Sequence, residues 1–162
     1  MDWREAFLRQ ARSDYETWGR LNKLGVEYSH QLHYIQMMTE KLAKAFLVRP
    51  GASNPPPLSH RAFVSMLRVI KGRNEIRKAL GYGNKKSYRA YLDSLLPIAD
   101  RLERLAPALA GTSQPNPEYP WRDARTGQVE APVDYPFPDF DPRRPEMAKL
   151  MTLVPQLLRV AT

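Results

Sequence analysis

The sequence predicts an all-α protein, folded as a mainly antiparallel bundle of four to five helices. Apolar residues recur every three or four positions over long stretches, and no stretch alternates apolar and polar residues as a strand does. Segments rich in proline and glycine separate the helical stretches. The 162 residues fit one domain, residues 1–162, and a chain of this length can bury a core without disulfides or metals.

The first two expected helices are amphipathic. Apolar residues spaced three and four apart predict a helix over residues 2–23 and a second over 26–47. Glu40 and Lys44 stand one turn apart in the second helix, in the order that favours an ion pair. Together with Lys41, they are expected to form a solvated charged face.

Capping residues and prolines set the bounds of the next helices. Ser59 is a good N-cap for a third helix, and Asn84 can cap a long helix that runs to about Leu109. Residues 74–80 fit a separate short helix. Pro97 removes one backbone donor from the long helix and is expected to kink it.

The composition changes over residues 111–145, which contain eight prolines and several aromatic residues. So long an irregular segment is uncommon inside a compact domain. Its aromatic side chains favour an apolar strap that packs on the bundle over a ligand-binding segment. They are Tyr119, Trp121, Tyr135, Phe137 and Phe140. A last helix is expected after Pro142 and runs to about Val160.

Composition restricts the class of protein. The chain has no cysteine, which excludes disulfides and cysteine-ligated zinc and is compatible with a reducing cytoplasm. No apolar run approaches the length that crosses a bilayer, and the first residues do not have the pattern of a secretory signal. We therefore expect a soluble cytoplasmic chain without membrane contact. Its formal net charge of +8 favours a polyanionic partner.

The positive charge is concentrated between Arg61 and Arg89, where the only acid is Glu75. Lysine and arginine neutralise phosphates, and the nearby Tyr82 could stack on an unpaired base. The alternative is a solvated helix face, with Tyr88 and neighbouring tyrosines turned inward. The expected phosphate-binding residues are Arg61, Arg68, Lys71, Arg73, Arg77, Lys78, Tyr82, Lys85, Lys86 and Arg89, preceded by His60 at the start of a helix. Capping of that helix is an equally good explanation of His60.

Several short patterns occur in the order and spacing of one known family. They are Trp3, Ala11, Asp14-Tyr15 and Leu21 in the first helix, Gln36, Glu40-Lys41 and Lys44-Ala45 in the second, His60 at the third, and Tyr119-Pro120 before the last. Over nearly the whole chain, this arrangement resembles the HEPN superfamily. The resemblance implies a helical bundle that binds nucleotides, RNA or a partner protein. It also implies a homodimer, a nucleotidyltransferase-linked, toxin–antitoxin or defence setting in a prokaryote, and no cofactor.

The sequence departs from the family in its catalytic signature. Ribonucleases of the superfamily carry an arginine four to six residues before a histidine, and no arginine stands there before His30, His33 or His60. The resemblance therefore implies a non-catalytic binding module. One alternative is a metal-independent endoribonuclease whose arginine and histidine come from separate helices, with His60 and one of Arg61, Arg49 or Arg68 as candidates. Another is a purely structural adaptor. His30 and His33 lack the further ligands that a metal site needs, so no metal is expected.

Overall fold

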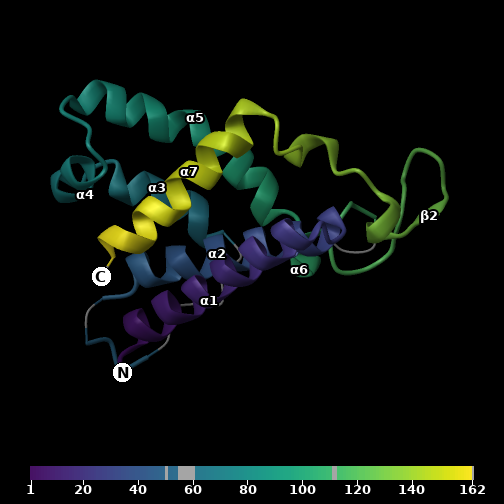
Figure 1. Ribbon diagram of the computed structural model, residues 1–162, viewed down its shortest axis with the longest axis horizontal. Helices are drawn as coiled ribbons and strands as arrows, with labels where there is room; N and C mark the ends of the chain where they lie inside the picture. The colour runs from purple at the N-terminus through teal and green to yellow at the C-terminus, as the bar shows by residue number, and fades with distance from the viewer. Residues whose placement is uncertain (50, 55–60, 111–112, 162) are drawn as a thin grey trace.

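The computed structural model describes residues 1–49, 51–54, 61–110 and 113–161. Within these residues the protein is mainly helical, as predicted, with one short two-stranded hairpin (Figure 1). The α-helices are α1 (Trp3–Leu24), α2 (Tyr28–Leu47), α3 (Ala62–Ile70), α4 (Asn74–Ala79), α5 (Lys85–Glu103), α6 (Pro107–Ala110) and α7 (Pro145–Val160). The strands are β1 (Trp121–Arg122) and β2 (Val129–Glu130), and two 3-10 turns are η1 (Pro132–Asp134) and η2 (Pro138–Phe140).

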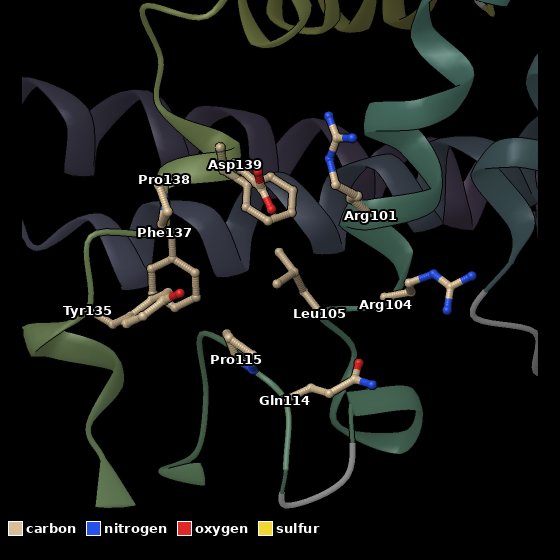
Figure 2. Close-up of a pocket in the computed structure, with 10 residues that line it drawn as sticks. Arg101, Arg104, Leu105, Gln114, Pro115, Tyr135, Phe137, Pro138 and Asp139 are labelled. Carbon is tan, nitrogen blue, oxygen red and sulfur yellow. The ribbon is translucent and has the colours of Figure 1, made fainter. Parts of the chain in front are cut away.

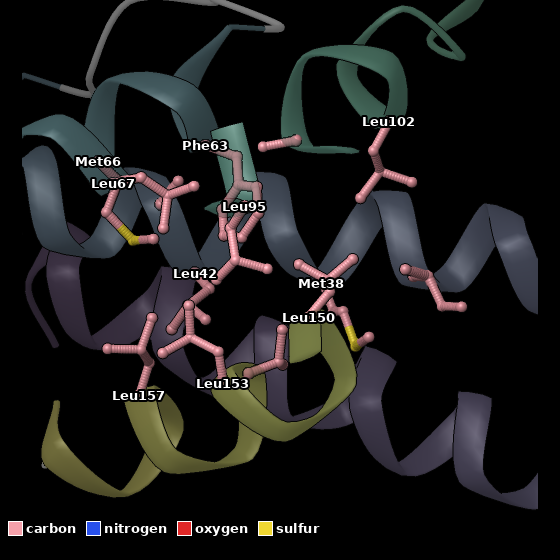
Figure 3. Close-up of a cluster of buried hydrophobic side chains, with 14 of the residues drawn as sticks. Met38, Leu42, Phe63, Met66, Leu67, Leu95, Leu102, Leu150, Leu153 and Leu157 are labelled. Atoms are coloured by element: carbon pink, nitrogen blue, oxygen red, sulfur yellow. The ribbon is translucent and has the colours of Figure 1, made fainter. Parts of the chain in front are cut away.

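Helix α2 lies at the centre of the molecule. Helix α1 runs antiparallel along one side of it, and α3, α5 and α7 cover other sides (Figure 1). Leucine, methionine and phenylalanine side chains from these helices form one buried cluster (Figure 3). The labelled members are Met38 and Leu42 of α2, Phe63, Met66 and Leu67 of α3, Leu95 and Leu102 of α5, and Leu150, Leu153 and Leu157 of α7.

Because neighbours surround it, α2 is buried on nearly every face, including polar positions that an amphipathic helix would expose. Ser29, Gln36, Thr39 and Lys44 are all buried. The Thr39 hydroxyl donates to the Ile35 carbonyl 3.0 Å away, which satisfies it within the helix. The Lys44 ammonium also has its partner within the helix, the Glu40 carboxylate one turn earlier.

The caps explain where two of the helices begin. The Asp2 carboxylate accepts from the backbone N–H of Glu5, and the predicted Asn84 cap of α5 accepts from that of Lys86. Helix α5 ends at Glu103, earlier than the expected Leu109, and Pro107 begins a separate short helix. Proline is favoured in the first turn of a helix, where no donor is needed.

The segment before α7 packs on the bundle, as predicted. Trp121, Phe137 and Phe140 are buried and belong to the main hydrophobic cluster. The expectation that the segment is wholly irregular is wrong, because β1 and β2 pair antiparallel and bring Trp121 opposite Glu130. Strands of two residues are too short to produce a detectable alternation of apolar and polar residues.

Among the described residues, no helix combines the length and the apolar character that crossing a bilayer requires.

Candidate functional site

Two ion pairs join basic residues at the two ends of α3 to α5. The Arg61 guanidinium lies 3.9 Å from the Asp100 carboxylate, and Lys71 pairs with Asp93. These contacts show which side of α5 faces α3. Lys85, Arg89 and Asp93 are spaced four apart and therefore share that side.

Arg68 completes this surface from α3, since it lies seven residues after Arg61 and three before Lys71. Lys86, seven residues before Asp93, completes it from α5. We call the surface the α3–α5 basic face. Its cationic residues are Arg61, Arg68, Lys71, Lys85, Lys86 and Arg89.

Four of these cations are available to a ligand. Arg68, Lys85, Lys86 and Arg89 are exposed. Within the described part of the chain, none of their charged groups forms a hydrogen bond or ion pair. The two carboxylates of the face are already paired with Arg61 and Lys71, so they leave these four charges uncompensated.

Three other predicted phosphate ligands are not part of the α3–α5 basic face. The Arg77 guanidinium donates to the carbonyls of Tyr82 and Gly83, the latter at 2.7 Å, and so holds the turn before α5 together. Arg73 is half-buried and lines a separate cavity with Arg4. Lys78 is exposed on α4. Arg77 thus has a structural contact in this turn, and its role as a phosphate ligand stays a prediction.

The tyrosines near the basic face pack against one another. The Tyr82 ring lies 5.5 Å from that of Tyr88 and 5.4 Å from that of Tyr91. The Tyr88 hydroxyl donates to the Ile70 carbonyl at 2.9 Å, and burial raises the pKa of this phenol to about 12. These contacts favour the packing explanation of the tyrosines over base stacking.

A carboxylate of α5 caps α3, although no local sequence pattern marks it as a cap. Glu103 Oε1 accepts from the backbone N–H groups of Phe63, at 2.6 Å, and Val64, at 3.1 Å. The side chain is 7% exposed, and burial raises its pKa to about 7 against the opposing effect of the two hydrogen bonds. The expected cap Ser59 and the candidate ligand His60 both lie outside the described residues.

The raised pKa of Glu103 predicts an unusual dependence of stability on pH. Its pKa rises from 4.5 to about 7 on folding. The folded state therefore holds the proton more tightly, and the free energy of unfolding should fall as pH rises from about 4.5 through 7, by about 3 kcal/mol. Denaturant unfolding of the wild type and of Glu103→Gln between pH 5 and 8 checks this. The variant keeps an acceptor oxygen but does not titrate, so its stability should fall less; parallel curves would contradict the prediction.

The neighbours of Glu103 have opposite effects on its pKa. Asp100, on the same helix, raises it, and Arg61, at the start of α3, lowers it. Both are present in the wild type and the variant, as are the histidines. The difference between the two curves therefore isolates the titration of Glu103.

The charged residues of α2 are largely buried. The Lys41 ammonium lies 2.6 Å from the Asp14 carboxylate of α1, and Lys44 pairs with Glu40 one turn earlier. Lys44 is 7% exposed, and its ammonium lies 5.9 Å from the centre of the Phe7 ring. The prediction of a solvated charged face is therefore wrong, because α1 covers this side of α2.

The described histidines do not form a metal centre. His33 Nδ1 lies 3.3 Å from a carboxylate oxygen of Glu118, which joins α2 to the proline-rich segment, and His30 is exposed. Within the described ranges, no group of three or more histidine, aspartate or glutamate side chains could hold a metal ion.

A cavity of about 200 Å³ lies where the C-terminal end of α5 meets the proline-rich segment (Figure 2). Tyr135 and Phe137 lie on one side of it, and Arg101 and Leu105 lie on the other (Figure 2). The sequence did not single out Arg101, because only the fold of the segment brings aromatic rings close to α5.

Comparisons with known proteins identify no relatives. A scan against models of protein families, a search of curated proteins and a search of solved structures each found no match.

Proposed function

We propose that this chain is a non-catalytic, HEPN-like module that binds RNA through the α3–α5 basic face. The observation that carries the proposal is the set of four exposed, uncompensated cations, Arg68, Lys85, Lys86 and Arg89. Contacts between such cations and phosphates release counterions from the nucleic acid, which favours binding.

The chemistry of the face favours contacts with the backbone over readout of bases. The rings of Tyr82, Tyr88 and Tyr91 pack together. The hydroxyl groups of Tyr88 and Tyr91 donate hydrogen bonds to backbone carbonyls. Lysine and arginine that contact phosphates position a nucleic acid without reading its sequence. Binding should therefore tolerate changes of RNA sequence and weaken steeply with salt.

The HEPN assignment and its setting belong to the same proposal. They rest on the motifs in helices α1 and α2 and on the order of the helices. Two of the motif residues, Asp14 and Lys41, form the ion pair between α1 and α2. On this basis we propose a homodimer that works with a nucleotidyltransferase or within a toxin–antitoxin or defence system.

Titration of a labelled single-stranded RNA at about 50 and 200 mM salt tests the binding. Lys85→Glu/Arg89→Glu should weaken binding at low salt by roughly tenfold or more, because two phosphate contacts become repulsive. Arg9→Glu/Lys23→Glu makes the same change of charge on exposed positions of α1 and should retain most of the affinity. Absence of binding at low salt, or equal losses in the two variants, would refute the proposal.

The same RNA separates binding from the alternatives. Incubation with the protein in EDTA should leave the RNA intact. Cleavage by the wild type but not by His60→Ala would replace the proposal with a metal-independent endoribonuclease. If the protein neither binds nor cleaves RNA, the remaining hypothesis is a purely structural adaptor.

A further inference from the structure

We infer that the cavity between the end of α5 and the proline-rich segment binds a small molecule with a planar apolar ring and an anionic group. The chemistry of this site differs from that of the α3–α5 basic face, because aromatic and aliphatic side chains form most of its wall. Its principal residues are Arg101, Arg104, Leu105, Tyr135, Phe137 and Phe140.

The aromatic wall is held rigidly in place. The rings of Tyr135 and Phe137 are nearly perpendicular, at 88° and 5.0 Å between centroids, and Trp121 packs edge-on against Tyr135 at 5.0 Å. Phe137 and Phe140 are buried, so their rings have little freedom to move. A rigid apolar wall can accept a flat ring without losing conformational entropy on binding.

The backbone at Phe137 supports a specialised role for this wall. Phe137 is the only non-glycine residue with positive φ in the described chain, at 44°. This conformation is unfavourable for a bulky residue and persists only where surrounding contacts stabilise it. Such positions are concentrated at ligand-binding sites.

Arg101 supplies the charge that an anionic group would pair with. It is half-buried, and its Nε is enclosed without a hydrogen-bond partner among the described residues. No ion pair within those residues involves its guanidinium. Partial burial of an unpaired charge is unfavourable, and an anion in the cavity would compensate it.

The other charged groups of the cavity already have partners. Arg104 Nε donates to the Asp100 carboxylate at 2.9 Å. Asp139 lies 3.7 Å from the Arg144 guanidinium, which offsets its repulsion of an anionic ligand. Arg101 is therefore the group that should select an acid over its neutral analogue.

The size of the cavity limits the ligand. Its volume of about 200 Å³ is below the range of sites for drug-sized ligands. A molecule with one ring or two fused rings fits better. Both a free aromatic acid and a nucleotide have this chemistry, so the two sources require separate tests.

The first test uses matched pairs of acid and neutral probes. Calorimetric titration of naphthalene-2-carboxylate against naphthalene-2-methanol, and of AMP against adenosine, should show binding of at least one acid and about tenfold weaker binding of its neutral partner. Binding of the carboxylate alone assigns an aromatic acid, and binding of AMP assigns a nucleotide. No binding of either acid, or equal binding of acid and neutral partner, would overturn the inference.

Variants locate the site. Arg101→Gln should weaken binding of the acid to the level of the neutral probe, whereas Arg125→Gln, on the exposed hairpin and outside the cavity, should have no effect. Gln114→Phe places a bulky ring at the exposed rim and should block both acid and neutral probes. Unchanged binding by folded Arg101→Gln and Gln114→Phe would overturn the assignment to this cavity. Circular dichroism confirms that each variant is folded.

Discussion

Replacing Asp14 with alanine is expected to lower the free energy of unfolding by about 3 kcal/mol. The Asp14 carboxylate is buried between α1 and α2, where it accepts from Lys41 at 2.6 Å and from Gln10 at 3.0 Å. Removing it leaves the Lys41 ammonium without its anion at a largely buried position. Breaking one side of a buried ion pair costs more than the pair itself contributes, because the remaining charge is uncompensated.

Urea denaturation measures this effect, with two further variants as controls. Glu16→Ala removes an exposed acid from the same helix and should change stability by less than about 0.5 kcal/mol. Asp14→Leu/Lys41→Met replaces both charges with apolar groups and should be more stable than Asp14→Ala. If Asp14→Ala were as stable as the wild type, the ion pair would not stabilise the contact between α1 and α2.

Phe137→Ala is expected to destabilise the protein by about 3 to 5 kcal/mol. The Phe137 side chain is 1% exposed and contacts the rings of Tyr135 and Trp121, with centroid distances of 5.0 and 6.1 Å. Truncation leaves a cavity inside the main hydrophobic cluster and removes the contacts that stabilise positive φ at this residue.

Thermal and denaturant unfolding of Phe137→Ala check this, with Tyr119→Ala as the matched control. Tyr119 belongs to the same segment, but 59% of it is exposed, so its truncation should cost less than about 0.5 kcal/mol. Equal and small losses in both variants would mean that the proline-rich segment contributes little to the stability of the bundle.

Local patterns were sufficient to predict most helices. The spacing of apolar residues predicted α1 and α2 to within about two residues, since that spacing depends only on the pitch of a helix. The Asn84 cap was predicted because a capping side chain bonds to a backbone group two residues further along the chain.

Contacts between distant parts of the chain were not predictable in this way. Glu103 caps α3 from 40 residues away, and no local pattern marks it as a cap. Lys44 was expected in solvent because charged helical residues are usually exposed, but packing of α1 buries it.

The candidate sites were also predictable only in part from local sequence patterns. The sequence located the positive charge between Arg61 and Arg89, but it did not distinguish a cation that holds a turn, such as Arg77, from one left exposed, such as Arg89. It identified the aromatic residues of the segment before α7 without indicating that Tyr135 and Phe137 line one cavity together with Arg101.

The helical class of the protein and the approximate bounds of its longer helices follow from local sequence patterns, because helical periodicity and capping are local properties. Which charges are paired, which are buried and which remain exposed to a ligand follows from how the chain packs. Those outcomes depend on the packing of α1 and α5 and of the proline-rich segment, and packing brings together residues that the sequence separates.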